Sequence, residues 1–379
     1  MKIFYWSPFF SNVATIKAVT RSAESLIKFT QNKKYKVSLI DAIGEWDQGE
    51  DIINKKISVI KLSSINLKNY LPKGGFLKSR ISYMTIFFWN FFKLKNLINK
   101  EIPDFLIIHL MTSLPIFLSS FFNSKTKIIL RISGLPKINM IRYLFWKLYA
   151  KKIYKVTCPT KKTYDFLLKK KIFDKQKIFI LRDPIIDMKE FLKKKKEVYN
   201  FACPIEKKYL ISIGRLTKQK NFELLINFFH KLLDKYSIFE LVIIGEGEDE
   251  LKLKKLAKKL DIDKKIHFLG YQKNIYKYLR NAECFILTSL WEDPGFVIVE
   301  AALSNISIIS SNCPNGPEEI IQKNGYLFQN NNLKNLLIKF DEFVGTNKDT
   351  IYQNKLILKK RIKKFSMFQH YKKLSEIIN

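Results

Sequence analysis

Cysteine and histidine are scarce in this sequence, with four residues of each type among 379. The cysteines show neither the spacing of a zinc-binding motif nor the pattern of a disulfide framework. These absences argue against a zinc finger and a disulfide-rich secreted domain, and they favour a reducing compartment such as the cytoplasm. The four cysteines are Cys158, Cys203, Cys284 and Cys313.

Long uncharged apolar runs are missing as well. No stretch of about 18 apolar residues occurs, so we expect no transmembrane helix. The first eight residues are too short for the apolar region of a signal peptide, and they are typical of the first strand of a sheet. A length of 379 residues and a hydrophobic content of 47% indicate two globular domains.

Acidic residues are few relative to basic ones: 34 Asp and Glu against 68 Lys and Arg give a formal net charge of +34. Such an excess suits a nucleic acid or an anionic membrane surface. The lysines are spread along the whole chain without a recognition-helix pattern, which argues against nucleic acid. Residues 79–100 combine aromatic residues with flanking cations, as in a helix that lies in a bilayer interface. A buried core helix is the alternative, because apolar residues run nearly all round it.

Short apolar segments alternate with helix-compatible segments, which predicts α/β domains with parallel sheets. In the first domain we predict a helix at about 14–30 and strands at 2–6, 35–40, 105–110, 127–132, 155–158 and 178–181. The first domain is expected to span 1–185 and the second 200–360. No internal repeat is visible.

Two glutamates, Glu292 and Glu300, lie eight residues apart around Gly295. A strand is predicted over 282–289 and a helix after Gly295. Glu292 is therefore expected in the connecting loop, and Glu300 about two turns into the helix, roughly 12 Å further along its axis. This separation suits two contacts to an extended ligand such as a sugar nucleotide, with a diphosphate at the helix N-terminus. By spacing alone, an ordinary loop glutamate and a solvated helix glutamate are the favoured interpretation, because such pairs are common by chance.

Two further predicted strands end in glycine turns. The first runs into Gly214, with Arg215 and Lys220 just beyond it, and the second runs into Gly245. Two cationic side chains can bind a diphosphate, and glycine lets the backbone approach a ligand closely. Because the carboxyl ends of parallel strands face one crevice, these turns and the loop of Glu292 predict a single site.

Taken in this order, the motifs within 207–330 resemble the nucleotide-binding domain of GT-B glycosyltransferases of family 4, which are retaining enzymes. The segments that carry the resemblance are 214–221, 245–247, 268–271, 292–300 and 324–328. The resemblance implies an α/β fold of two Rossmann-like doubly wound domains facing across a cleft. It also implies that a C-terminal helix within 361–379 crosses back to the first domain.

The resemblance implies roles for individual residues. Arg215 and Lys220 would bind the donor diphosphate, Glu292 would lie beside the donor sugar, and Glu300 would hold the ribose hydroxyls. His109, at the end of a predicted first-domain strand, would lie near the donor sugar and the acceptor; a structural histidine is the alternative. The other residues implied at the donor site are Gly214, Gly245, Glu246, Gly270, Gly295, Phe296 and Val297.

The implied activity is transfer of a sugar from a nucleoside-diphosphate sugar, with UDP-sugars favoured, to a glycan or glycolipid acceptor. Retention of configuration is expected, as is a place in lipopolysaccharide, capsule or lipid-linked oligosaccharide synthesis. No cofactor and no metal are expected, and Asp261 with Asp263 predicts a solvated turn. The expected location is the cytoplasm or the inner face of the cell membrane, with an anionic membrane surface as a partner. The alternatives are a nucleic-acid-binding protein, a GT-B sugar-nucleotide epimerase or phosphorylase, and a non-catalytic subunit that binds a sugar nucleotide.

The sequence departs from the family pattern at several places. Where family members have glycine after the helix of the second glutamate, this chain has Asn305, which can adopt the same left-handed conformation. The loop at 7–15 lacks the family's glycine pair, and Ser11 or Asn12 is expected to cap the following helix. Arg131, after another strand, is expected to be either an exposed turn residue or a contact to an anionic acceptor.

Overall fold

The computed structural model describes residues 1–9, 14–30, 35–47, 54–72, 76–122, 125–199, 205 and 207–379. The chain divides into two compact units: Met1–Ile185 with Met367–Asn379, and Ile186–Ser366. Helix α6 (Met188–Tyr199) belongs to the second unit, although it precedes residue 200. The helix cap expected at Ser11 or Asn12 lies outside the described residues.

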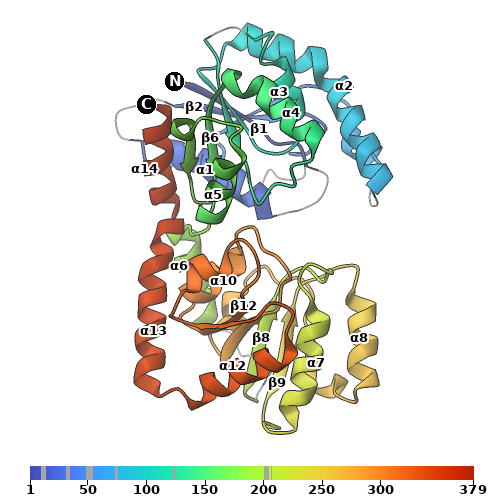
Figure 1. Ribbon diagram of the computed structural model, residues 1–379, viewed down its shortest axis with the longest axis vertical. Coiled ribbons are helices and arrows are strands. Elements are labelled where there is room, and N and C mark those ends of the chain that lie inside the picture. Colours follow the sequence, from blue (N-terminus) through green and yellow to red (C-terminus); the bar gives the residue numbers. More distant parts are fainter. Residues whose placement is uncertain are drawn as a thin grey trace. The chain divides into compact units, whose positions relative to one another are not determined.

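The first unit contains a seven-stranded parallel sheet in the order β3-β2-β1-β4-β5-β6-β7 (Figure 1). Its strands are β1 (Lys2–Trp6), β2 (Lys36–Asp41), β3 (Ser58–Lys61), β4 (Phe105–Ile108), β5 (Lys127–Arg131), β6 (Ile153–Cys158) and β7 (Ile178–Ile180). The chain moves outward from β1 to β3 and then returns to the other side at β4, which makes the sheet doubly wound. We predicted no strand at β3, an edge strand of only four residues, three of which are exposed.

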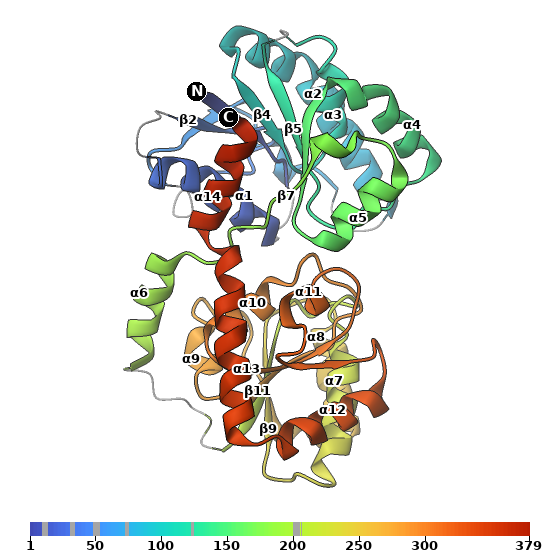
Figure 2. The same cartoon turned by 60° about the vertical axis from the view of Figure 1, so that its left-hand side comes forward.

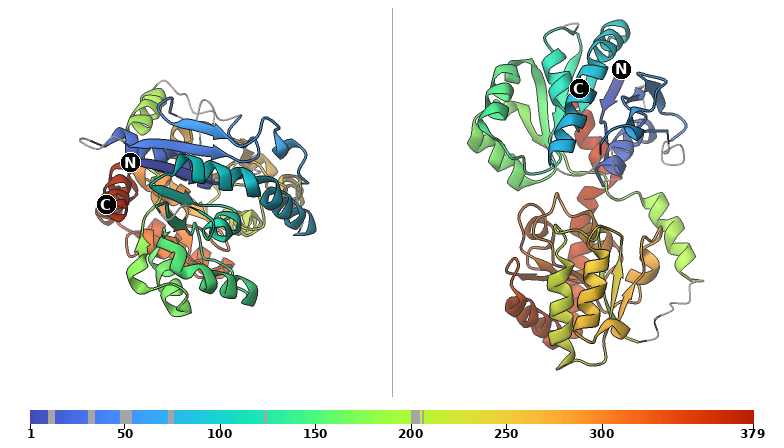
Figure 3. Two further views of the ribbon diagram at one scale, coloured as in Figure 1. Left: turned by 90° about the horizontal axis from the view of Figure 1, so that it is seen from above. Right: turned by 90° about the vertical axis from the view of Figure 1, so that its right-hand side faces the viewer.

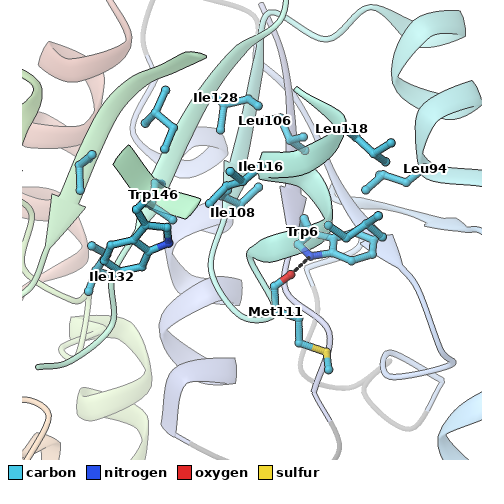
Figure 4. Close-up of a cluster of buried hydrophobic side chains, with 14 of the residues drawn as sticks. Trp6, Leu94, Leu106, Ile108, Met111, Ile116, Leu118, Ile128, Ile132 and Trp146 are labelled. Carbon is cyan, nitrogen blue, oxygen red and sulfur yellow. Dashed lines mark hydrogen bonds between the residues drawn. The ribbon is translucent and has the colours of Figure 1, made fainter. Parts of the chain in front are cut away.

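Helices cover both faces of this sheet (Figure 2). One face is covered by α2 (Phe76–Glu101), α3 (Ser113–Leu118), α4 (Met140–Tyr149) and α5 (Lys161–Lys170), and the other by α1 (Ala14–Lys28) and α14 (Met367–Ile378). Figure 4 shows part of the first layer, where the indole of Trp6 donates a hydrogen bond to the carbonyl of Met111 at 3.2 Å. Residues 79–100 are helical within α2, and Ile86, Leu94 and Ile98 lie in this core. One face of that helix is therefore buried in the core, as the alternative interpretation of residues 79–100 expected.

The second unit contains a six-stranded parallel sheet in the order β10-β9-β8-β11-β12-β13. Its strands are β8 (Tyr209–Ile213), β9 (Glu240–Ile244), β10 (Ile266–Phe268), β11 (Cys284–Leu287), β12 (Ser307–Ser311) and β13 (Tyr326–Phe328). The strand order reverses between β8 and β11, so the carboxyl ends of these two strands mark the switch point at which open α/β sheets bind ligands.

Eight α-helices belong to this unit in the described part of the chain, and Figure 3 shows α7 and α8 side by side. Besides α6 they are α7 (Phe222–Leu233), α8 (Glu250–Lys259), α9 (Tyr276–Leu279), α10 (Phe296–Leu303), α11 (Pro317–Ile321), α12 (Leu333–Gly345) and α13 (Lys348–Arg361). After α10, Asn305 has a φ of +62°, so the left-handed conformation expected there is confirmed. Among all helices in the described ranges, none is long and apolar enough to span a bilayer.

Helix α14 joins the first unit through a buried chain of hydrogen bonds. The Nδ1–H of His370 donates to the carbonyl of Arg182 at 2.6 Å. Its Nε2 therefore accepts from the hydroxyl of Ser22 at 2.8 Å, and Ser22 in turn contacts the hydroxyl of Tyr5 at 3.0 Å. Burial of the ring lowers the pKa of His370 to about 3 by desolvation, although the hydrogen bond to the Arg182 carbonyl acts in the opposite direction.

This neutral, buried histidine predicts a loss of stability in acid. The pKa of His370 in the folded state lies below the ordinary value of about 6.5. The contribution of His370 to the free energy of unfolding is therefore complete above pH 6.5 and is lost progressively as the pH falls toward 3. The free energy of unfolding, measured by urea denaturation, should fall between pH 7 and 5 by up to about 1.4 kcal/mol per pH unit. His370→Gln should flatten this dependence, whereas His230→Gln on α7 serves as the control. An unchanged pH profile in His370→Gln would contradict the prediction.

Candidate active site in the second unit

The loop between β8 and α7 brings two predicted cations to the carboxyl end of the central strand. The amide of Gly214 donates to the carbonyl of Ile244 at 2.9 Å, which ties this turn to β9. A Cβ atom on Gly214 would lie 3.2 Å from the side chain of Lys220, so glycine leaves room for that lysine. Arg215 is exposed, and its guanidinium has no partner among the residues that the structure describes. It is available to an anionic ligand.

Glycines join the ends of the three strands β8, β9 and β10. Gly245 has a φ of +136°, and a Cβ atom there would lie 1.9 Å from the carbonyl oxygen of Gly214. Its amide donates to the carbonyl of Gly270, which itself has a φ of +63°. A carboxylate oxygen of Glu246 accepts from the amide of Tyr271 at 3.1 Å. At Gly245, close backbone packing therefore explains why the position requires glycine.

Glu292, in the loop after β11, is buried and forms an ion pair with Lys220. The Nζ of Lys220 lies 2.5 Å from Oε1 of Glu292, and the side chains are 14% and 5% exposed. The same oxygen accepts a hydrogen bond from the hydroxyl of Ser289 at 2.6 Å. The Glu292 amide donates to the carbonyl of Pro314 at 3.1 Å. Glu292 is thus held at the switch point, with a cation beside it.

Helix α10 directs its N-terminus into the same region. Gly295 precedes its first residue with a φ of +92°, a conformation that favours glycine. The first hydrogen bond of the turn runs from the amide of Ile298 to the carbonyl of Gly295 at 3.1 Å. In the described part of the chain, the amides of Phe296 and Val297 have no backbone acceptor. They remain as donors for an anion, in line with the positive end of the helix dipole.

The position of Glu300 differs from the expectation. Since α10 begins at Phe296, Glu300 is its fifth residue and lies just over one turn into the helix, where two turns were expected. Glu292 lies outside the helix, so helical periodicity does not relate the two carboxylates. Glu300 is partly exposed, and its carboxylate has no partner among the described side chains. It is therefore available for hydrogen bonds to hydroxyl groups.

Sequence reasoning missed the polar side chains that hold this loop. Ser289 binds Glu292, and Gln219 donates to the carbonyl of Trp291 at 2.9 Å. Only the position of Ser289 at the end of the predicted strand could have indicated its role. Among the described residues, no group of three or more His, Cys, Asp or Glu residues could hold a metal ion. Asp261 and Asp263 lie in an exposed turn before β10, as predicted.

His109 lies in the first unit, directly after β4, and it is 7% exposed. Burial first, and then the nearby charge of Arg131, hold its pKa well below the ordinary value. Its Nδ1 has no hydrogen-bond partner among the described residues. His109 is one of the residues that line a cavity of about 10 Å³, close to the volume that one water molecule needs. The catalytic role assigned to His109 stays a prediction.

Neither expectation for Arg131 was right. The side chain is 3% exposed, donates to the carbonyl of Leu181 and forms a buried ion pair with Asp183. Asp183 lies 52 residues away in the chain, so no local pattern indicated this partner. Arg131 is therefore committed to the interior of the first unit.

Residues 193–361 match the family described as glycosyl transferases group 1. This range contains β8 to β13 and every loop of the candidate site. The similarity to this family therefore lies in the second unit and covers less than half of the chain. The resemblance noted for 207–330 is thereby confirmed for this part of the chain.

Two curated relatives illustrate the extent of the sequence similarity. An uncharacterized glycosyltransferase of Methanocaldococcus jannaschii is 39% identical over 127 residues, which are 31% of this chain and 31% of that protein. The amylovoran biosynthesis glycosyltransferase AmsD of Erwinia amylovora is 32% identical over 126 residues, 33% of this chain and 35% of that protein. The matches thus span about a third of the length of these relatives.

A solved structure extends the likeness in fold to the whole chain. A variant of S. aureus TarM, in complex with Fondaparinux, alpha-GlcNAc-glycerol and UDP, has a TM-score of 0.72 and 14% identity. The alignment covers 100% of this chain and 99% of that one. The predicted GT-B fold, with two Rossmann-like parallel-sheet domains, is confirmed.

Proposed function

We propose that this protein transfers a sugar from a nucleoside-diphosphate sugar to a hydroxyl group of a glycan or glycolipid acceptor, with retention of configuration. The observation that carries the proposal is the set of groups at one sheet edge: Arg215, the Lys220–Glu292 pair and the free amides of α10. UDP-sugars are the favoured donors, which the UDP bound to the TarM variant supports. Lipopolysaccharide, capsule or lipid-linked oligosaccharide synthesis is the proposed process, and the relative named for amylovoran biosynthesis supports a biosynthetic role of this kind.

The proposed donor lies along the carboxyl edge of the second sheet. Its diphosphate binds Arg215 and Lys220 and accepts hydrogen bonds from the amides of Phe296 and Val297. Glu300 accepts hydrogen bonds from the ribose hydroxyls. These groups are fixed before the reaction, so they can stabilise the negative charge that grows on the departing diphosphate. No metal ion and no cofactor are part of this proposal.

The ion pair between Lys220 and Glu292 gives both residues a defined place in the proposed reaction. Glu292 holds the ammonium group of Lys220 near the switch point. A bound diphosphate would share the ammonium group with Glu292, while the carboxylate lies beside the donor sugar. The acceptor hydroxyl attacks from the face that the diphosphate leaves, which retains the configuration. We place the reaction in the cytoplasm or at the inner face of the cell membrane.

Thermal unfolding with UDP, GDP, ADP and CMP, each with and without Mg²⁺, tests the donor site. A ligand that binds only the folded state at one hundred times its Kd stabilises by about 2.7 kcal/mol. We expect UDP to raise the unfolding temperature, with or without Mg²⁺. Glu300→Ala should lose this shift because the ribose contact is removed, whereas Glu248→Ala, at an exposed position, should keep it.

Two results would contradict this assignment. If no nucleotide raises the unfolding temperature, the assignment of the donor site is wrong. If the rise requires Mg²⁺, the proposal that donor binding needs no metal is wrong. A product assay with the stabilising nucleotide's sugar then separates transfer to an acceptor from epimerisation or phosphorolysis.

A further inference from the structure

Helix α2 exposes an apolar stripe on the side opposite its buried face. Five large side chains follow one another at intervals of four, three, four and four residues, which is the helical repeat. Each is between 55% and 75% exposed; they are Leu77, Ile81, Met84, Phe88 and Phe92. Single exposed apolar residues are common on protein surfaces, but a row of this length indicates a contact with an apolar partner.

Helix α4 exposes a second apolar stripe. Its buried residue is Trp146, which packs in the core with Ile86 of α2. The opposite side carries four large side chains between 58% and 78% exposed, namely Met140, Ile141, Leu144 and Leu148. This stripe was not apparent in the sequence, because α4 is apolar on several sides.

The two stripes lie on the same side of the first unit. Both helices bury their inner faces against one face of the seven-stranded sheet. Helix α3 lies between α2 and α4 (Figure 1). The ring centroid of its Phe117 is 6.0 Å from that of Phe91 of α2 and 6.2 Å from that of Tyr149 of α4. The outer faces of α2 and α4 therefore point away from the same face of the sheet. We call the nine exposed side chains the two-stripe surface.

Cations accompany both stripes, and acidic residues are nearly absent. The helices carry Lys78, Arg80, Lys93 and Lys95 on α2 and Arg142 and Lys147 on α4. Glu101 and Asp104 are the only acidic residues between Asp51 and Asp165. Glu101 is paired with Lys2 at 3.1 Å. The surroundings of the two-stripe surface are thus strongly basic.

The exposed apolar side chains and the neighbouring cations together indicate which kind of partner binds the two-stripe surface. A second copy of the chain would bring two basic surfaces together, which like-charge repulsion opposes. A nucleic acid offers phosphates, but it offers no apolar medium for aliphatic side chains such as Ile141 and Leu148. An anionic bilayer supplies both a hydrocarbon boundary and negatively charged headgroups.

We propose that the two-stripe surface docks on an anionic lipid bilayer. The apolar side chains of α2 and α4 enter the interface between headgroups and acyl chains, and the neighbouring cations meet the headgroup phosphates. Docking needs no helix to span the bilayer. It is independent of the donor site in the second unit, so either property can fail while the other holds.

Cosedimentation of the full chain with vesicles tests the proposal. We expect binding to phosphatidylcholine vesicles that contain phosphatidylglycerol to exceed binding to phosphatidylcholine alone by at least ~tenfold, and to weaken with salt. Phe88→Ser with Phe92→Ser should lower the partition coefficient by ~tenfold or more, because two exposed phenyl groups are lost. Ile141→Ser with Leu148→Ser should do the same from α4, and all four changes together should abolish binding.

Leu251→Ser is the matched control, since Leu251 is 75% exposed on α8 of the second unit. It should bind vesicles like the parent. All variants should keep the thermal shift with nucleotide, which shows that folding and the donor site are intact. Equal vesicle binding by parent and variants, or no binding by the parent, would overturn the proposal. So would a dimer, or a complex with duplex DNA, that forms without lipid and is lost in the same variants.

Discussion

Replacing Arg215 with Ala is expected to lower sugar transfer by at least ~100-fold while the chain stays folded. The guanidinium is exposed and has no partner among the described residues, so its removal breaks no contact of the ligand-free protein. The whole effect should fall on the diphosphate, whose negative charge increases as the sugar leaves. Initial rates with a UDP-sugar measure the loss of transfer, and circular dichroism of the variant shows whether it stays folded.

Lys220→Ala should lower transfer to a similar extent, but it should also change stability. Its ammonium group is the ion-pair partner of Glu292, which is 4% exposed. Removing one partner of a buried pair leaves the other charge without compensation, which costs about 3–5 kcal/mol for a fully buried pair and less where one partner is partly exposed. A loss of transfer in the Lys220 variant is therefore assigned to the diphosphate contact only if the Arg215 variant, which keeps its stability, loses transfer as well.

Lys218→Ala is the matched control for both, because Lys218 is an exposed lysine of the same loop. It should retain most of the parental rate. Full activity in both the Arg215 and the Lys220 variants would remove the assignment of this loop to the donor diphosphate.

Gly245→Ala is expected to destabilise the second unit by about 3 kcal/mol or more and to abolish nucleotide binding. A Cβ atom would lie 1.9 Å from the carbonyl oxygen of Gly214, and the φ of +136° is unfavourable for any side chain. The backbone has to move, and with it the turn that leads to Arg215 and Lys220. Urea denaturation and the nucleotide-induced thermal shift measure both effects.

Gly345→Ala is a suitable control for this substitution. Gly345 ends α12, and nothing lies within 4 Å of an added Cβ atom. Alanine favours helix more than glycine by up to about 1 kcal/mol, so stability should be unchanged or slightly higher. A Gly245 variant as stable as the parent, with the same nucleotide shift, would show that the close approach of β8 and β9 is not required.

The local pattern of the chain was sufficient to predict the parallel α/β architecture and the three loops of the candidate site. A strand that ends in a glycine turn can be recognised within a few residues, as at Gly214 and Gly245. The helix start at Gly295 and the left-handed Asn305 follow from equally local rules. The edge strand β3 was missed, because it has only four residues and three of them are exposed.

Pairings between distant residues could not be predicted in this way. Lys220 and Glu292 are 72 residues apart, and they meet because β8 and β11 are neighbours in the sheet. Arg131 ends β5 and Asp183 follows β7, with β6 between these two strands, so the strand order of the first sheet also brings this pair together. Strand order depends on which faces pack against which helices, and no segment contains that information by itself.

The sequence alone determined that the chain forms two parallel-sheet domains and that Arg215, Lys220, Glu292 and Glu300 follow strand ends. It did so because strand and turn preferences act over a few neighbouring residues. Only the tertiary structure decided which charges are paired and which are available. It also decided that one side of α2 is core while the other is exposed, because burial depends on the packing of helices on a sheet.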